Sequence, residues 1–163
     1  MDDKSDQAAR LLRDKRGGHW YDNGVRFRCI HPLCSDCCSG RRGPGYVWLG
    51  EGEMRAIADH LGIKLDAFTR RFVRTVDGNY SLVEKHNNDC VFLEEGKCTI
   101  YPVRPVQCRT YPFWPEVMTS RQRWQRESRA CPGVEVDETM VSGAQVEAQL
   151  SAEELSRASE GRV

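Results

Sequence analysis

Apolar residues recur at helical spacing between positions 50 and 62 of the chain. The stripe consists of Met54, Ile57, Ala58 and Leu61. Gly50 and Gly62 lie at its two ends, where glycine is tolerated before a helix and favoured after one. Glu53 follows Gly50 by three positions, where the helix dipole favours an acidic side chain. The pattern therefore predicts a helix that begins near Gly50 and ends at Gly62.

A second apolar stripe predicts another helix, over about residues 66–74. Leu65, Phe68 and Phe72 line one face of it, and Asp66 is expected to cap its N-terminus. Aromatic and aliphatic side chains at this spacing are typical of a protein core. We therefore assign both helices a structural role rather than a role in binding a cofactor.

Three shorter helices are predicted from end signals and charge. Residues 5–15 form the first, which stops before a pair of glycines. Pro105 suits the first turn of the second helix, and Pro112 would end it. Residues 121–129 form a charged third helix, in which Trp124 is expected to face inward.

The strands predicted from the sequence are short and arranged in hairpins. Asn23-Gly24 is a strong turn signal, because this dipeptide readily takes the backbone angles of a tight hairpin. It separates residues 19–21 from residues 25–29, where apolar and basic side chains alternate. Val25 and Phe27 are expected to face one side of the second strand.

A second hairpin is predicted around two further cysteines. Residues 90–93 and 98–101 have the composition of strands, and a charged four-residue turn joins them. Each strand begins with a cysteine, so this hairpin would bring Cys90 and Cys98 toward one site. Residues 79–84 form a further predicted strand.

Short strands mixed with helices predict a small α+β domain. A chain of 163 residues has room for one ordinary domain. We divide it into an N-terminal extension (1–18), a cysteine-cluster domain (19–133) and an acidic tail (134–163). The tail is nearly free of aromatic residues, so we expect it to be weakly ordered, apart from a short helix capped at Ser151.

Composition and charge exclude several classes of protein. The formal net charge is zero, and the basic residues outside the tail are scattered, which argues against nucleic-acid binding. No apolar run approaches the roughly 18 residues of a membrane span. The first residues lack the apolar stretch of a secretory signal, so we expect a cytoplasmic location.

The candidate chemistry of the chain resides in eight cysteines. They are Cys29, Cys34, Cys37, Cys38, Cys90, Cys98, Cys108 and Cys131. In a reducing compartment such a set favours metal binding over disulfides. Thiolate sulfur is a preferred ligand of Zn²⁺ and of iron–sulfur clusters. All eight are therefore candidate metal ligands, enough for two four-coordinate sites or for one cluster and a spare set.

The spacing of the cysteines leaves the identity of the metal open. The two-residue gap between Cys34 and Cys37 lets both sulfurs approach one ion. Cys37 and Cys38 are adjacent, and neighbouring side chains tend to point apart, so the pair could serve two sites or two irons of one cluster. The irregular gaps lack the paired knuckles of a zinc ribbon. They favour an iron–sulfur cluster such as [4Fe-4S] slightly over Zn²⁺.

Basic residues near the cysteines could balance the negative charge of a thiolate site. The candidates are Arg41, Arg42, Arg104 and Arg109. An ordinary surface role is the equal alternative for each of them. His31 lies between the first two cysteines and could be a ligand, although a lone histidine is more often a packing or surface residue.

Longer motifs surround the cysteines, and together they resemble one known family. The motifs are Cys34-Ser-Asp-Cys37-Cys38, Gly-Pro-Gly-Tyr-Val-Trp-Leu at 43–49, Asp-Cys-Val-Phe-Leu at 89–93, Cys-Thr-Ile-Tyr-Pro-Val-Arg-Pro at 98–105, Gln-Cys-Arg-Thr-Tyr-Pro-Phe-Trp at 107–114 and Ala-Cys-Pro-Gly at 130–133. This pattern resembles the CxxCxxCC cysteine-cluster family (YkgJ-like), described as zinc- or iron-chelating domains. The resemblance covers about residues 19–133 and includes all eight cysteines.

The resemblance implies binding of a metal ion or an iron–sulfur cluster, and it names no reaction. Some members of the family are labelled flagellin N-methylases, which implies a protein-lysine methylase, or a subunit of one, as an alternative. The family usually separates its first two cysteines by two residues, whereas four lie between Cys29 and Cys34 here. This departure weakens Cys29 as an equivalent ligand and favours His31 slightly.

Three functions are therefore compatible with the sequence. The first, which we favour, is a metal-binding protein without catalysis of its own, serving in electron transfer, metal handling or scaffolding. The second is the methylase, for which the chain shows no methyl-donor motif. The third is a thiol-based redox sensor, suggested by the adjacent Cys37 and Cys38. A protein partner is compatible with each of them, and the sequence identifies none.

Overall fold

The computed structural model describes residues 17–136 and 138–161. It divides the chain into two compact units. The first contains the residues up to Ile30 together with Thr110–Ala152, and the second contains His31–Arg109 together with the residues from Glu153 onward. Both combine helices with short antiparallel strands, so the α+β class is confirmed. The helix predicted over residues 5–15 lies outside the described residues.

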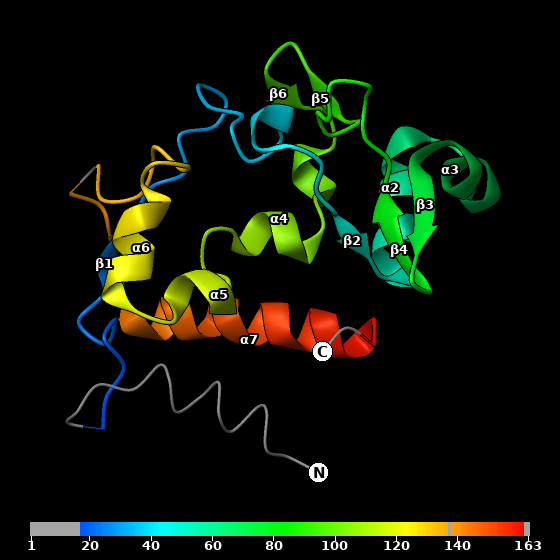
Figure 1. The fold of residues 1–163 in the computed structure, drawn as a ribbon. Helices are drawn as coiled ribbons and strands as arrows, with labels where there is room; N and C mark the ends of the chain where they lie inside the picture. The colour runs from blue at the N-terminus through cyan, green and yellow to red at the C-terminus, as the bar shows by residue number, and fades with distance from the viewer. Residues whose placement is uncertain (1–16, 137, 162–163) are drawn as a thin grey trace. The chain divides into compact units, whose positions relative to one another are not determined.

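A three-stranded antiparallel sheet organises the second unit. Its strands lie in the order β2 (Trp48–Leu49), β4 (Asn79–Leu82) and β3 (Val73–Val76). Figure 1 shows the helices α2 (Glu51–Leu61) and α3 (Leu65–Phe72) beside this sheet, and α3 contacts both α2 and β3.

The core of the second unit gathers apolar side chains from the sheet, the two helices and the segment that follows them. Its buried members are Leu49, Met54, Ile57, Ala58, Phe68, Leu82, Phe92 and Ile100. Most of them come from the two predicted helical stripes and the predicted strand over residues 79–84. The structural role assigned to these helices therefore agrees with their burial.

Helix α2 is confirmed at both of its ends. The Glu53 carboxylate accepts a hydrogen bond from the Gly50 backbone nitrogen at 2.9 Å. Gly62 closes the helix in the left-handed conformation, with φ of 66°. These end signals are local in the sequence, which is why the boundaries could be predicted.

Helix α3 differs from its prediction at both ends. It begins at Leu65 after the N-cap Lys64, so that Asp66 lies in the first turn and is not the cap. It ends at Phe72, because Val73–Val76 form strand β3, which pairs with β4. The turn between these strands contains Asp77 and Gly78, both with positive φ, as a tight hairpin requires.

The second hairpin is shorter than predicted and lies nearer the turn. Strands β5 (Leu93–Glu94) and β6 (Lys97–Cys98) are two residues each, and both turn residues between them have positive φ. Cys98 lies in β6, whereas Cys90 precedes β5 and forms an isolated bridge with Glu84. The short helices η2 (Tyr101–Val103) and α4 (Val106–Thr110) follow, and α4 lies where a short helix is predicted between Pro105 and Pro112.

The first unit contains a two-stranded sheet of β1 (Val25–Arg26) and β7 (Met140–Val141). Helices α5 (Pro115–Met118) and α6 (Arg121–Glu127) contact each other and are labelled in Figure 1. The buried core residues of this unit are Tyr21, Val25, Phe113, Val117, Met118, Trp124, Val134, Val146 and Leu150. Trp124 is fully buried within α6, which confirms its predicted orientation.

The first predicted hairpin is wrong in its pairing. Val25 is buried and Arg26 is exposed, as expected, but their partner strand is β7 and not residues 19–21. Residues 20–23 form a turn instead, after which the nitrogen of Gly24 donates to the Tyr21 carbonyl oxygen at 2.7 Å. The Tyr21 side chain is buried, so this segment contributes to the core of the first unit and does not form a strand beside β1.

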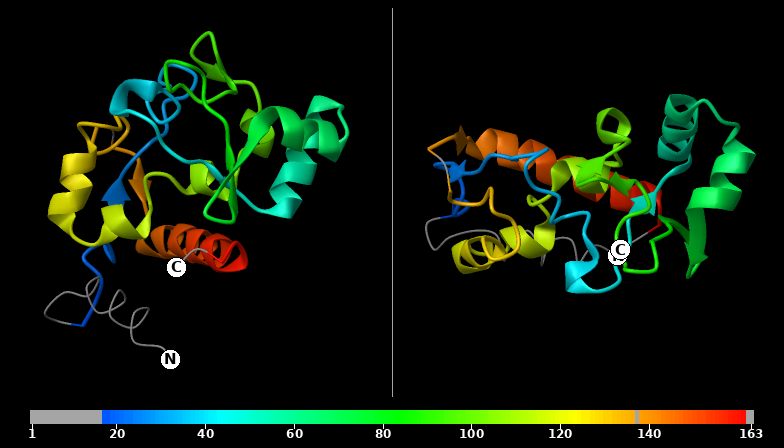
Figure 2. Two further views of the ribbon diagram at one scale, coloured as in Figure 1. Left: turned by 45° about the vertical axis from the view of Figure 1, so that its right-hand side comes forward. Right: turned by 90° about the horizontal axis from the view of Figure 1, so that it is seen from above.

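The acidic tail differs from the expectation of weak order. Residues Gly143–Ser159 form the continuous helix α7, drawn orange to red in Figure 2. It begins with a capping box, since Ser142 Oγ accepts from the Gln145 nitrogen and Gln145 Oε1 accepts from the Ser142 nitrogen. Val146 and Leu150 are buried on one face of the helix. Among the described residues, no helix combines the length and apolar character that crossing a membrane requires.

Candidate metal centre

Six of the eight cysteines belong to the second unit. They are Cys34, Cys37, Cys38, Cys90, Cys98 and Cys108. The first three lie on the loop before the short helix η1 (Gly40–Arg42), Cys90 precedes β5, Cys98 lies in β6 and Cys108 lies in α4. Cys34, Cys38, Cys90, Cys98 and Cys108 are thiols and not halves of disulfides.

Hydrogen bonds join the loop of Cys38 to the loop of Cys90. The Cys90 nitrogen donates to the Cys38 carbonyl oxygen at 2.8 Å. The Gly40 nitrogen donates to Asp89 Oδ1 at 2.7 Å. A side chain at Gly40 would place its Cβ only 2.1 Å from the Asn87 carbonyl oxygen. The absence of a side chain at Gly40 therefore allows the two cysteine loops to pack together.

Asp89 fixes the same junction through its carboxylate. The Asn87 amide donates to the second carboxylate oxygen of Asp89 at 2.8 Å. The hydrogen bond from the Gly40 backbone, followed by the one from Asn87, lowers the pKa of Asp89. The carboxylate is therefore ionised and holds the loops at neutral pH.

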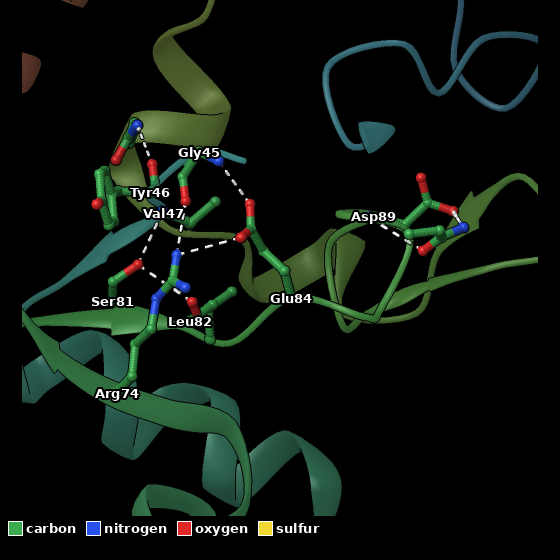
Figure 3. Close-up of polar contacts among 10 residues, drawn as sticks. Gly45, Tyr46, Val47, Arg74, Ser81, Leu82, Glu84 and Asp89 are labelled. Atoms are coloured by element: carbon green, nitrogen blue, oxygen red, sulfur yellow. Dashed lines mark hydrogen bonds and ion pairs between the residues drawn. The ribbon is translucent and has the colours of Figure 1, made fainter. Parts of the chain in front are cut away.

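An ion pair between Arg74 and Glu84 holds the segment around Gly45, which follows the cysteine loop. Arg74 donates to the Gly45 carbonyl oxygen at 2.7 Å and to Glu84 at 3.3 Å. Glu84 in turn accepts from the Gly45 nitrogen at 2.6 Å, so that the three residues close a ring of contacts (Figure 3). Because Glu84 also bridges Cys90 through the backbone, this network connects the sheet to the cysteine loops.

The sulfur atoms of Cys37 and Cys38 lie 3.9 Å apart. Two sulfurs that bind one tetrahedral zinc ion at about 2.3 Å are separated by about 3.8 Å. The adjacent side chains therefore approach each other, contrary to the usual tendency of neighbours to diverge. Their spacing suits two ligands of one ion.

Five thiols lie close enough to affect one another electrostatically. Hydrogen bonding with Cys37, then burial, then the charges of Cys37, Cys90 and Cys108 raise the pKa of Cys38. Burial raises the pKa of Cys90 to about 11, with the charges of Cys98 and Cys37 adding to it. Thiols drawn from four separate segments therefore share one neighbourhood.

The pKa values of two further members of this group, Cys98 and Cys108, are also raised. Burial, followed by the charges of Cys90, Cys37 and Cys98, raises the pKa of Cys108 well above its usual value. Burial also raises the pKa of Cys98. Several thiolates cannot coexist at such a place without a compensating cation, and a metal ion supplies that charge. The donor set therefore fits a thiolate-bound metal.

The side chains are gathered but do not form a closed coordination shell. Within residues 17–136 and 138–161, no group of three or more His, Cys, Asp or Glu side chains converges closely enough to hold a metal ion. The sulfur of Cys34 accepts a hydrogen bond from the Asp36 nitrogen at 3.5 Å.

His31, Tyr101 and Arg104 form a stack beside this group. The rings of His31 and Tyr101 are stacked with centroids 4.0 Å apart. The guanidinium carbon of Arg104 lies 3.7 Å from the centroid of the Tyr101 ring. Burial, followed by the charges of Arg104 and Lys97, lowers the pKa of His31. Sequence reasoning missed Tyr101, whose only signal is its place three residues after Cys98.

The four arginines proposed to balance the thiolates differ in their surroundings. Burial raises the pKa values of Cys98 and Cys108, and the positive charge of Arg104 acts against that rise. Arg41, in contrast, is exposed and forms an ion pair with Asp36 at 3.2 Å. Arg109 is exposed on α4. The side chain of Arg42 is outside the described part of the structure. The electrostatic contacts therefore support Arg104 most directly.

Cys29 and Cys131 belong to the first unit. The nitrogen of Arg28 donates to the Gly133 carbonyl oxygen at 3.1 Å. A Cβ at Gly133 would lie 2.2 Å from the Arg28 carbonyl oxygen, so this close approach requires glycine. The pairing places Cys29 and Cys131 on neighbouring segments, with Cys29 exposed and Cys131 packed against the core.

Comparison with known proteins identifies a family and relatives that include an archaeal protein. A family model described as "CxxCxxCC: Putative zinc- or iron-chelating domain" matches residues 28–132. "Uncharacterized protein MJ0661" of Methanocaldococcus jannaschii is 30% identical over 103 residues, which cover 62% of this chain and 52% of that protein. The chain thus spans about half the length of this relative. No solved structure matches the chain.

Proposed function

The chain belongs to the CxxCxxCC family, and on this premise we propose that it is a metal-binding protein whose cysteine thiolates hold the metal. The observation that carries the proposal is the group of five thiols in one unit. These are Cys37, Cys38, Cys90, Cys98 and Cys108. Each of the four with a raised pKa is affected by at least one other member of the group.

We assign the first metal site to ligands from this group, with Cys34 as a further candidate on the same loop. The hydrogen bond between Cys38 and Cys90 and the Gly40–Asp89 contact support this assignment, since they hold the two loops together. Cys29 and Cys131 remain candidate ligands, and they lie on neighbouring segments of the first unit. The metal would supply the positive charge that these thiolates lack.

The finer proposal is an iron–sulfur cluster, such as [4Fe-4S], in a reducing cytoplasmic setting. The irregular cysteine spacing and the presence of more than four neighbouring thiols support a cluster over one tetrahedral zinc ion. Raised thiol pKa values argue against a peroxide-sensing role, because the thiolate is the reactive form.

Anaerobic purification followed by visible absorption and elemental analysis tests this proposal. A brown protein that contains iron and labile sulfide, with a broad band near 400 nm (roughly where thiolate-ligated clusters absorb), would support the cluster. A colourless protein with one or two zinc ions would keep the metal-binding function and reject the cluster. A folded protein that neither retains nor takes up iron or zinc would contradict the proposal as a whole.

A Cys108→Ser variant provides the matched test of the ligand assignment. Serine is nearly isosteric with cysteine but is a poor ligand for these metals at neutral pH. We expect the variant to lose bound metal from the first site. Retention of the full metal content by this variant would remove Cys108 from the ligand set.

A further inference from the structure

Three buried nitrogen atoms of the second unit have no hydrogen-bond partner among the described residues. They are Nε of Arg74, Nε2 of His31 and Nε of Arg104, and the last two lie against the same aromatic ring, that of Tyr101. Buried polar atoms are rarely left without a partner, because removal from water is costly unless a new hydrogen bond replaces the lost ones. Two such atoms beside one tyrosine indicate a common partner that is bound in the functional protein.

The stack on Tyr101 holds both side chains in defined positions. The His31 ring lies nearly parallel to the Tyr101 ring, at an angle of 14°. The Arg104 guanidinium contacts the same tyrosine through its charge, at 3.7 Å from the ring centroid. Planar groups fixed in this way lose little freedom when they make a hydrogen bond, so they are preorganised to meet a ligand.

The chemistry of arginine determines what the missing partner can be. A guanidinium carries only donors and is always protonated, so its Nε requires an acceptor. A metal cation is not an acceptor, whereas a thiolate or sulfide sulfur is. Arg104 acts electrostatically on Cys98 and Cys108, so its charge is close enough to influence two of the proposed ligands.

We propose that Arg104 Nε and His31 Nε2 are outer donors, held by Tyr101, that hydrogen-bond to sulfur atoms of the metal-loaded site. The proposal rests on the proposed function, since it requires a thiolate-bound metal. The two donors stabilise the anionic loaded state over the metal-free state. They thereby raise the affinity of the site, in the manner of other residues just outside a ligand shell.

The test compares metal affinities of single variants under anaerobic conditions. Each protein is loaded with Co²⁺, followed by its thiolate-to-cobalt absorption, and the cobalt is then displaced with Zn²⁺. Arg104→Gln removes the donor, and His31→Phe keeps a ring on Tyr101 while removing the nitrogen. We expect each variant to bind Zn²⁺ about 10- to 100-fold more weakly and to shift the cobalt band.

Arg71→Gln is the matched control, because it removes an exposed arginine of the same unit, on helix α3, that has no proposed role at the site. We expect its affinity and its cobalt band to equal those of the wild type. If Arg104→Gln binds as tightly as the wild type, or if Arg71→Gln weakens binding equally, the proposed hydrogen bond from Arg104 is wrong. An unchanged His31→Phe variant would likewise remove His31 from the proposal.

Arg104→Lys keeps the test decisive if Arg104→Gln fails to fold, as judged by circular dichroism. Lysine retains the charge but has no Nε donor and no planar group. Binding weaker than wild type by Arg104→Lys would support a specific hydrogen bond, and wild-type binding would overturn it. If the wild-type protein takes up neither Co²⁺ nor Zn²⁺, the proposed function itself fails, which distinguishes the two results.

Discussion

At the scale of single residues, the surroundings of the buried cysteines oppose the ionisation that metal binding requires. Burial and neighbouring sulfurs hold the thiols in the protonated form, with the pKa of Cys90 raised to about 11. Metal binding needs the thiolate, so the same burial that protects a loaded site makes the empty site reluctant to ionise. This conflict has consequences for the dependence of stability on pH.

The metal-free protein is expected to lose stability as the pH rises. Thiols of the unfolded chain ionise near pH 8.5, whereas those of the folded chain stay protonated to higher pH. Above that value the folded state binds more protons than the unfolded state, so the free energy of unfolding falls with increasing pH. The loss should extend from about pH 8.5 toward the raised pKa of Cys90 at about 11.

Urea titrations of the chelator-treated protein at a series of pH values would measure this loss. Cys90→Ala and Cys108→Ala provide the control, because each removes one of the buried thiols and should flatten the decline. A metal-free protein whose free energy of unfolding stays constant across this range would contradict the burial of these thiols.

The affinity of the protein for metal should increase with pH, whereas the stability of the metal-free protein decreases. Each thiol that binds the metal releases its proton, so the affinity for Zn²⁺ should rise with pH by about tenfold per unit for each proton released. Zinc competition measurements between about pH 6 and 8 would determine the number of protons. An affinity that does not change with pH would mean that the ligands are not protonated thiols.

At the scale of loops and helices, Gly40 is expected to be indispensable for the site. Gly40→Ala would drive a methyl group to within 2.1 Å of the Asn87 carbonyl oxygen. Backbone atoms on both sides must then separate, at a cost of about 1–3 kcal/mol. We expect a lower free energy of unfolding together with weaker metal uptake.

Gly52→Ala is the matched control for this prediction. Gly52 lies in the first turn of α2, and nothing lies within 4 Å of an added Cβ. Alanine should stabilise the helix there by about 0.5–1 kcal/mol. Urea unfolding of the two variants should therefore give shifts of opposite sign, and equal shifts would contradict the packing of the two loops.

Helix α7 offers a second comparison between two similar residues. Leu150 is 3% exposed and belongs to the core of the first unit, whereas Leu155 is 72% exposed. Leu150→Ala should lower the free energy of unfolding by about 2–5 kcal/mol, and Leu155→Ala should change it by less than about 0.5 kcal/mol. Similar small effects for both variants would mean that the tail is weakly ordered after all.

These elements also show which parts of the fold could be predicted. Helix α2 has its cap signals within the helix and its flanking residues, so both ends were found. The partner of β1 was missed, because Val25 pairs with Val141 and no local pattern encodes a contact over that separation. Strand β3 was missed because the helix predicted over residues 66–74 includes the first two residues of this strand.

The candidate site divides in the same way. Sequence alone identified the cysteines, since thiolate chemistry is a property of residue type. It could not show that Cys37 and Cys38 share a neighbourhood with Cys90 and Cys108, because this depends on how the loops are packed. Nor could it reveal the stack on Tyr101, which forms only in the folded chain.

At the scale of the whole molecule, metal binding should be coupled to folding of the second unit. A ligand that binds only the folded state stabilises it by about 3 kcal/mol at a hundredfold excess over its Kd. For a chain of this length that corresponds to a rise in melting temperature of about 6–12 °C. Three of the proposed ligands, Cys37, Cys38 and Cys90, lie outside the helices and named strands, so the gain should be concentrated in their loops.

Hydrogen exchange measured with and without metal would locate this gain. We expect slower exchange in the cysteine loops over residues 34–42 and 85–98 of the loaded protein, and little change in α6 (Arg121–Glu127) of the other unit. Cys108→Ser should abolish the difference, because one ligand from α4 would be missing. Equal slowing in both units would assign the stabilisation to the chain as a whole, and slowing confined to α6 would move the metal to Cys29 and Cys131.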